Sequence, residues 1–200
     1  MNWLVIDIIK RKEKIILTAI EVLYEAGIRG MTIKEIAKRQ NISEPAIYRH
    51  FNSKKDIIIE ILRRYSKYDD VIKNTVIENG IEGTNAIKYF CRSYAEYYPN
   101  YPEITTVMFS FDIFKYDEDL NQQMKKIIDN RYNLLLEFVL RAIEIKQVSL
   151  TSDAQVLTDS IFSILWGTTF IWRMQNCSFD IKERILMEVD NIINIYGGKL

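Results

Sequence analysis

The segment from Asn41 to Asp56, NISEPAIYRHFNSKKD, gathers side chains that suit contact with a polyanion. It holds the only histidine of the chain, His50, directly after Tyr48 and Arg49, and two lysines follow within five residues. Lysine, arginine and tyrosine donate hydrogen bonds to phosphate oxygens, and arginine also reaches guanine edges in DNA. A lone histidine among such donors favours a contact with DNA over a role as a catalytic base.

Catalytic and metal-binding constellations are not apparent elsewhere in the sequence. The acidic segments YDD and FDIFKYDED lack a second cluster and a partnering histidine, so we expect their carboxylates to be loop and helix-cap residues. These carboxylates include Asp112, Asp117, Glu118 and Asp119. The sequence also has neither a phosphate-cradling glycine loop nor a nucleophile elbow. We therefore expect no enzyme activity, no metal site and no cofactor.

The composition indicates a mostly helical, cytoplasmic protein. The chain has 200 residues, 48% of them hydrophobic, and only 7 Gly and 3 Pro, which suits one large or two small helical domains. Cys91 and Cys177 have no Cys or His neighbours at metal-ligand spacing, and we expect two buried thiols in a reducing compartment. No run approaches the roughly 18 apolar residues that a membrane span needs. The first nine residues, MNWLVIDII, lack a preceding basic region and so do not resemble a secretory signal.

Charge is distributed unevenly along the chain, although the net charge is zero. Residues 10–64 hold 13 Lys and Arg against 7 Asp and Glu, whereas residues 65–200 hold 14 against 19. A basic part followed by an acidic part is the pattern expected when one end of a protein meets a polyanion and the other does not. The expected DNA contact therefore lies in the first third of the chain.

Local signals predict several helices in this first third. The first spans Lys10 to Ala26, because apolar residues recur at helical spacing and Gly27 follows as a left-handed cap. Residues 1–9 form either an extra turn of this helix or a loose arm. Thr32, with Glu35 three residues later, forms a capping box that starts a second, short helix.

The next helix carries the polyanion-binding side chains. It begins after a cap at Ser43 and tolerates Pro45, because first-turn amides have no partner within a helix. Ile47 and Phe51 are four residues apart and point to the core, and a further helix begins after a cap at Ser53. Two short helices joined by a tight turn are typical of a helix-turn-helix, whose second helix enters the DNA major groove by its N-terminal residues.

The stretch IILTAIEVLYEAGIRGMTIKEIAKRQNISEPAIYRHFNSKKDIIIEIL resembles the DNA-binding part of the TetR family of bacterial transcriptional regulators. The shared features are a first helix ending in Gly, a Thr-capped second helix containing IA, and then Ser, small residues, IY, His, F and SK. The resemblance covers about the first third of the chain. It implies an all-α protein with an N-terminal three-helix helix-turn-helix domain, residues 1–52, and a larger C-terminal helical ligand-binding and dimerisation domain, residues 53–200. Residues 53–75 would form the connecting helix.

The resemblance also implies roles for individual residues. Thr32, Tyr48 and Lys54 match positions that hold DNA phosphates. The groove-reading surface comprises Ser43, Glu44, Pro45, Ala46, Arg49 and His50. Glu44 departs from the family pattern, in which a basic residue is common, and a carboxylate repels phosphate unless it accepts from a cytosine amine. Glu44 is either a specificity element or turned away from DNA, and the second interpretation is preferred.

The chain from residue 65 onward is predicted to be entirely helical. The expected helices are Glu82 to Tyr98, a short one after Pro102, Leu120 to Ile145, Asp153 to Asn176 and Ile181 to Tyr196. The last two suit the four-helix homodimer interface that the family resemblance implies. The expected interface residues are Ser160, Ser163, Gly167, Ile185, Val189 and Ile192.

Aromatic residues and methionines gather on the inward faces of the middle helices. They are either ordinary core or the lining of an apolar cavity for a small-molecule effector. The candidate lining residues are Tyr94, Met108, Phe111, Met124, Tyr132 and Trp166. Arg131 lies near the same stripe, but we expect it to form a surface ion pair. Since no histidine or carboxylate cluster faces inward, the effector is expected to be mainly apolar, aromatic or long-chain.

The expected function is that of a ligand-responsive regulator that binds a palindromic, double-stranded operator as a homodimer and is released by its effector. Repression as the mode follows from the family resemblance alone. Two alternatives stay open: a ligand-independent DNA-binding protein that acts through protein partners, and a helical enzyme with a DNA-binding head. An enclosed cavity, a filled core, or clustered carboxylates with a metal would distinguish these three classes.

Overall fold

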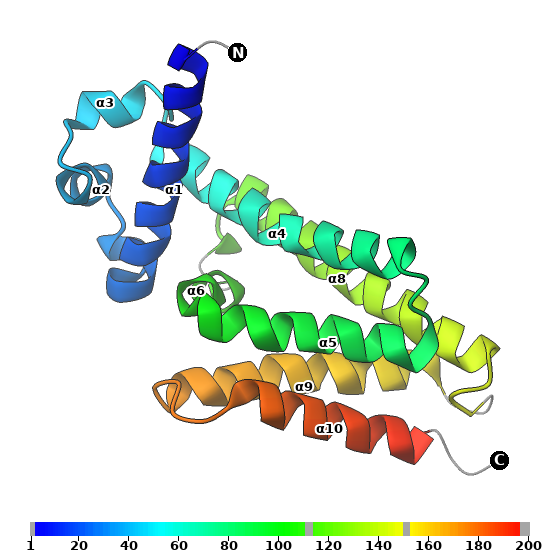
Figure 1. Ribbon diagram of the computed structural model, residues 1–200. Helices are drawn as coiled ribbons and strands as arrows, with labels where there is room; N and C mark the ends of the chain where they lie inside the picture. The colour runs from blue at the N-terminus through cyan, green and yellow to red at the C-terminus, as the bar shows by residue number, and fades with distance from the viewer. Residues whose placement is uncertain (1–2, 111–113, 150–152, 197–200) are drawn as a thin grey trace. The chain divides into compact units, whose positions relative to one another are not determined.

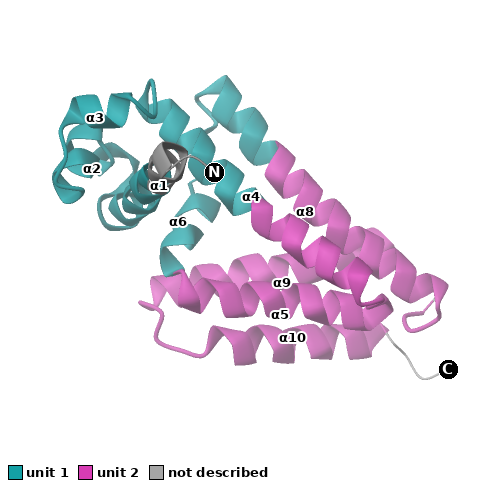
Figure 2. Cartoon of the chain, turned by 45° about the horizontal axis from the view of Figure 1, so that its top comes forward, with its two compact units in different colours: residues 1–66, 102–125 teal, residues 67–101, 126–200 magenta. Residues whose placement is uncertain are grey.

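The computed structural model describes residues 3–110, 114–149 and 153–196, and every regular element in these ranges is a helix. The helices form two compact units, coloured separately in Figure 2. Unit 1 comprises Met1–Ser66 and Pro102–Lys125, and unit 2 comprises Lys67–Tyr101 and Lys126–Leu200. The expected all-α fold is therefore confirmed.

Unit 1 contains the helices of the first third of the chain and one segment from its middle. Its complete helices are α1 (Trp3–Gly30), α2 (Ile33–Arg39), α3 (Glu44–Tyr48), the 3-10 helix η1 (Pro102–Ile104) and α6 (Thr105–Met108), all labelled in Figure 1 except η1. The first part of α4 (Lys54–Glu78) and the start of α8 (Glu118–Glu144) also belong to unit 1. Helix α1 packs against α2 and η1, and α2 packs against α3. The unit thus includes residues 102–125, which we expected within the C-terminal domain.

Helix α1 is longer than predicted at both ends. It begins at Trp3 instead of Lys10, so residues 3–9 extend the helix. Gly27 has φ 66° and ψ −177°, a conformation that glycine adopts without a steric penalty and that interrupts the helix at the expected cap. One more helical turn then continues to Gly30, and the amide of Met31 donates to the carbonyl of Gly27 at 3.1 Å.

Side chains at two of the three predicted caps receive backbone hydrogen bonds. The Thr32 hydroxyl accepts from the Glu35 amide at 3.1 Å, and the Ser53 hydroxyl accepts from the Asp56 amide at 3.1 Å. The Asp56 carboxylate in turn accepts from the amide of Asn52 at 2.9 Å, which completes a reciprocal cap at the start of α4. Ser43 occupies the cap position of α3, but its side chain makes no cap hydrogen bond.

Unit 2 is built on three helices that lie side by side in Figure 1, α5 (Gly83–Asn100), α9 (Ala154–Met174) and α10 (Ile181–Tyr196). The second parts of α4 and α8 complete it. Helix α5 continues through Pro99 instead of ending before it, because a proline in the last turn removes only one hydrogen bond. Cys91 is buried, which raises the pKa of its thiol, but Cys177 is only half-buried after the end of α9. The expectation of two buried thiols is therefore wrong for Cys177.

Candidate nucleic-acid interface

A tight turn positions α3 against α2. Asn41 adopts a left-handed conformation, with φ 52°, and the amide of Ile42 closes the end of α2 by donating to the carbonyl of Ala37 at 3.0 Å. Ile47 and Phe51 are buried, so one face of the segment is fixed to the core of unit 1. This is the helix-turn-helix geometry that the local signals predicted.

The opposite face of the α3 segment carries the predicted groove-reading residues. Ser43, Glu44, Pro45, Tyr48 and Arg49 are exposed, and Ala46 and His50 are half-buried. Because α3 ends at Tyr48, Arg49 and His50 do not continue the helix but occupy its cap and the following turn. The structure thus brings these residues together on one short exposed segment, and their contacts with DNA stay predictions.

A basic contribution from α1 was missing from the predicted interface. Partial burial, and then the positive charges of Arg11, Arg49 and Lys12, lower the pKa of His50 below its ordinary value. The Lys12 ammonium also lies 5.4 Å from the centre of the Phe51 ring. Arg11 is exposed, so the positive surface extends from the α3 segment onto α1. The signal in the sequence was the basic run KRKEK at residues 10–14.

Two of the predicted phosphate ligands already have partners in unit 1. The Lys54 ammonium donates to the carbonyl of Ile28 at 2.5 Å, and burial lowers its pKa. Lys54 therefore binds the last turn of α1 in addition to contributing a positive charge to unit 1. The exposed Thr32 hydroxyl accepts from Glu35, but a hydroxyl that accepts at its oxygen still has a hydrogen to donate.

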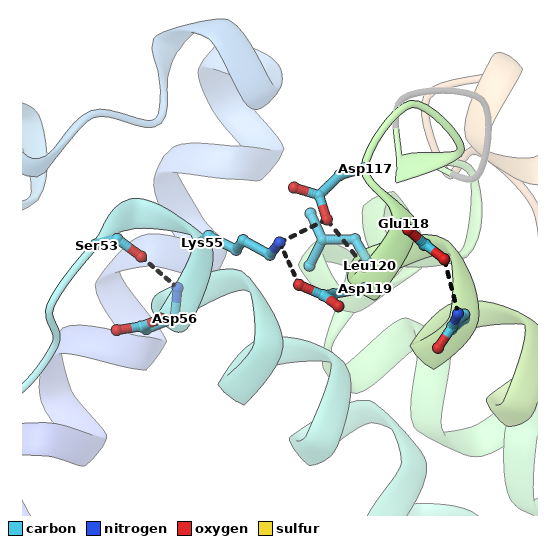
Figure 3. A network of polar contacts seen from close by, with 8 residues as sticks. Ser53, Lys55, Asp56, Asp117, Glu118, Asp119 and Leu120 are labelled. Atoms are coloured by element: carbon cyan, nitrogen blue, oxygen red, sulfur yellow. Dashed lines mark hydrogen bonds and ion pairs between the residues drawn. The ribbon is translucent and has the colours of Figure 1, made fainter.

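Within unit 1, an ionic contact joins the start of α4 to the segment before α8 (Figure 3). The Lys55 ammonium lies 2.8 Å from Asp117 Oδ1 and 2.5 Å from Asp119 Oδ2, and these carboxylates raise the pKa of Lys55. Asp117 also accepts from the amide of Leu120 at 3.2 Å, as expected for a helix cap. Among the described residues, no group of three or more His, Cys, Asp or Glu is arranged to hold a metal ion. Asp112 lies outside the described residues.

The structure does not bring the predicted effector-binding residues together within one unit. Met108 and Met124 are buried in unit 1, whereas Tyr94, Tyr132 and Trp166 belong to unit 2. Phe111 lies outside the described residues.

Within unit 2, the Phe162 ring contacts both Tyr132 and Trp166. The centre of the Phe162 ring lies 5.7 Å from that of Tyr132 and 5.9 Å from that of Trp166. The Tyr132 hydroxyl donates to Asp159 at 2.7 Å, and this contact raises the pKa of Tyr132 to about 12. Tyr94 is buried and donates to Asp69 instead.

The expectation of a surface ion pair at Arg131 is wrong. Arg131 is 3% exposed and pairs with Asp69, which is 7% exposed. Arg131 Nε donates to Asp69 Oδ1 at 2.9 Å, and Nη2 donates to Oδ2 at 3.2 Å. The two residues are 62 positions apart in the sequence, so only the packing of α4 against α8 in unit 2 reveals the partner.

The predicted dimer-interface residues fall into two classes. Ile185 and Val189 are fully buried within the chain, so they have no surface to offer a second subunit, and their assignment to the interface is wrong. They pack inward because α10 lies against α5 and α9. Ser163 is exposed, and the remaining predicted residues are half-buried: Ser160, Gly167 and Ile192.

Large apolar side chains surround the small residues of α9 on the open side of α9 and α10. These exposed residues, which were not among the predicted interface residues, are Val156, Phe170, Ile171, Met174, Met187 and Ile195. Met174 is 68% exposed and Ile195 is 73% exposed. Their apolar spacing along both helices was visible in the sequence, but which side of each helix packs inward was not. None of the described helices is both long and apolar enough to cross a membrane.

Comparisons with known proteins agree with this architecture. A sequence model described as "Bacterial regulatory proteins, tetR family" matches residues 15–61. The biofilm operon icaADBC negative transcriptional regulator IcaR of Staphylococcus aureus (strain Newman) is 30% identical over 132 residues, which cover 61% of this chain and 69% of IcaR.

Solved structures show the same fold at low sequence identity. The fatty acid degradation regulator FadR of Bacillus halodurans has a TM-score of 0.80 and 19% identity, over 92% of this chain and 94% of FadR. FadR of Bacillus subtilis, solved in complex with stearoyl-CoA, has a TM-score of 0.78 and 17% identity, over 91% and 97% of the two chains.

The helix-turn-helix of unit 1, the family match over it and the similarity to IcaR over most of that regulator's length lead to one conclusion. The chain belongs to the TetR family of bacterial regulatory proteins, and it is a DNA-binding transcriptional regulator and not an enzyme.

Proposed function

We propose that this chain is a repressor that binds a palindromic operator as a homodimer and is released by a small, mainly apolar effector. In this proposal residues 1–52 contact DNA, residues 53–75 connect, and residues 53–200 hold the effector and the dimer interface. The observation that carries the homodimer is the open apolar side of α9 and α10, with Ser163 and Gly167 at its centre. Several large apolar side chains exposed on neighbouring helices favour an interaction site in a folded protein.

Dimerisation supplies the geometry that a palindromic operator needs. Helix α3 has only five residues, so a single copy contacts a few base pairs at most. A two-fold dimer places two such segments about 34–36 Å apart, one turn of B-DNA, and thereby selects two half-sites at fixed spacing. An effector shifts this arrangement only by binding more tightly to the conformation that does not fit the operator.

Repression and an apolar effector are supported by what related proteins do. IcaR is a negative transcriptional regulator, and FadR of Bacillus subtilis has been solved with stearoyl-CoA, whose acyl chain is long and apolar. The alternative is a ligand-independent regulator that acts through protein partners. It predicts that no small molecule changes operator affinity.

Selection of bound sequences from a random DNA library tests the proposal directly. The expected result is an inverted repeat whose half-sites are one helical turn apart, bound by two chains per site. Arg49→Ala should change the selected bases, whereas the matched control Lys182→Ala, on α10, should not. Selection of a non-repeated sequence, or binding of one chain per site, would refute the homodimeric repressor. A later screen of apolar compounds for operator release tests the effector.

A further inference from the structure

A buried polar centre lies inside the otherwise apolar unit 2. It consists of Asp69 on α4, Tyr94 on α5 and Arg131 on α8. Besides the paired contacts of Arg131 with Asp69, the Tyr94 hydroxyl donates to Asp69 Oδ1. The guanidinium carbon of Arg131 lies 4.6 Å from the centre of the Tyr94 ring, at the distance of a cation–π contact. Burial raises the pKa of Tyr94, so its phenol stays a hydrogen-bond donor.

Stability does not account for an ion pair in this position. Removing two charges from water costs about as much as their attraction returns, and apolar side chains of similar volume often serve equally well. A buried guanidinium with a fixed planar face is, however, well suited to recognise a carboxylate in a bidentate manner. In this structure Arg131 holds the carboxylate of Asp69 in this manner.

A series of tyrosine rings connects this centre with the surface of unit 2. Tyr68 lies edge-on to Tyr94, with ring centres 5.5 Å apart, and stacks on Tyr97 at 4.2 Å. Tyr97 in turn contacts Tyr101 at 5.2 Å, and Tyr101 is 57% exposed. Rings from two helices thus form an aromatic surface that begins in solvent and ends at the buried guanidinium.

We propose that Arg131 anchors the head group of the effector, a single carboxylate on an apolar or aromatic body, and that Asp69 occupies this place when no effector is bound. The body of the effector then packs against the outer faces of Tyr68, Tyr97 and Tyr101. This inference rests on the proposed release by an effector and names its chemical class.

Asp69, and not Arg131, is the partner that gives way. Arg131 is held by the stacking contact with Tyr94 and has a long side chain that adjusts to a new partner. Asp69 has one methylene group, so its carboxylate leaves Arg131 by a change of its χ1 rotamer or by a shift of the α4 backbone. Helix α4 begins at Lys54, directly after the α3 segment, so the exchange changes the helix that leads to the DNA-contacting residues.

Rescue by formate tests whether the site accepts a free carboxylate. Asp69→Ala removes the carboxylate that Arg131 Nε and Nη2 contact and leaves its place open. Sodium formate should then raise the Tm of Asp69→Ala by roughly 3 to 5 °C at about ten times its dissociation constant. Formamide, and sodium chloride at equal ionic strength, should not. Rescue should disappear in Asp69→Ala/Arg131→Met and persist in Asp69→Ala/Arg141→Met. Arg141 lies on the same helix, is only half-buried and pairs with Glu82 at 3.0 Å.

Paired amphipathic probes provide the second measurement, and Asp69→Asn serves where Asp69→Ala fails to fold. Decanoate should bind the full chain at least about tenfold more tightly than decanamide, the ratio that one charge-assisted hydrogen bond supplies. Asp69→Asn should increase the affinity for decanoate, because the internal competitor is gone. Decanoate, but not decanamide, should release operator DNA.

Three results would refute Arg131 as the binding site of the effector carboxylate. The first is a folded Asp69→Ala variant that formate does not stabilise, and the second is stabilisation by formate that persists in Asp69→Ala/Arg131→Met. The third is equal affinity of the chain for decanoate and decanamide. Release of the operator by a neutral compound, independent of Arg131, would also overturn the anchor but would leave the effector-released repressor standing. A chain that binds DNA as a monomer would remove the proposed function without changing the formate result, so the two failures are distinguishable.

Discussion

Gly167→Leu tests whether the side of α9 around Gly167 contacts a second subunit or packs within the chain. Gly167 lies near the middle of α9, between Ser163 and Phe170 on the open apolar side. A Cβ atom placed on Gly167 meets no atom of the chain within 4 Å. A side chain at this position therefore starts into open space in the single chain, and we expect a leucine to crowd only a second copy packed against α9.

The size of the effect follows from the symmetry of the interface. Inserting extra methylene groups into a packed contact typically costs about 1–3 kcal/mol. In a two-fold interface each substitution occurs twice, so the dimer loses about 2–6 kcal/mol, or roughly 30-fold to more than 10⁴-fold in its dissociation constant. The single chain does not share this loss, because leucine is about 0.8 kcal/mol more favourable than glycine within a helix.

Sedimentation equilibrium over a range of protein concentrations measures the dimer, and circular dichroism during heating measures the fold. We expect Gly167→Leu to be monomeric at concentrations where the parent is dimeric, with its helical content unchanged. Gly167→Ala is the matched control and should weaken the dimer much less. A dimer of parental strength in Gly167→Leu would show that the interface lies elsewhere. A parental dimer with a lowered Tm would show that this side of α9 packs within the chain.

Three further substitutions test the DNA-contacting segment and the core. Lys54→Ala should reduce the slope of log operator affinity against log salt concentration by about 0.9. It should also lower the Tm, because the Ile28 carbonyl loses its hydrogen-bond donor. An unchanged slope in a gel-shift titration would exclude the phosphate contact of Lys54. His50 has a lowered pKa in the free protein, and a DNA phosphate nearby favours its charged form. DNA binding should therefore take up a proton, so the affinity for the operator should rise as the pH falls from about 7.5 to 6. His50→Gln should remove that dependence, and an identical pH profile in this variant would refute the assignment. Ile185→Ala should lower the free energy of unfolding in urea by about 2–5 kcal/mol, because its side chain is fully buried within the chain; a weaker dimer with unchanged unfolding would instead place Ile185 in the interface.

The sequence predicted unit 1 well where structure depends on neighbouring residues. Thr32 and Ser53 receive the expected cap hydrogen bonds, and Gly27 has the expected positive φ, because these features involve residues no more than four apart. The alternation of buried and exposed residues around Ile47 followed for the same reason. Lys54 is the exception, since its partner Ile28 lies 26 residues away.

In unit 2, local sequence patterns did not predict which side of each helix is buried within the chain. Apolar periodicity located α9 and α10 to within a few residues, but both helices carry apolar residues on buried and on exposed sides. Periodicity alone therefore assigned Ile185 and Val189 to a subunit interface, whereas α5 covers them within the chain. Which apolar stripe faces a neighbouring helix depends on how all three helices pack.

The sequence by itself determined the all-α class, the helix-turn-helix and the regulatory family, because helix signals and the DNA-contacting segment are local and strongly constrained. Only the tertiary structure decided that Arg131 is buried, that Asp69 pairs with it, and that the predicted effector residues are divided between two compact units. Arg131 and Asp69 meet across 62 positions of sequence. The free energy of a charged side chain depends on that partner, and no local pattern around Arg131 specifies it.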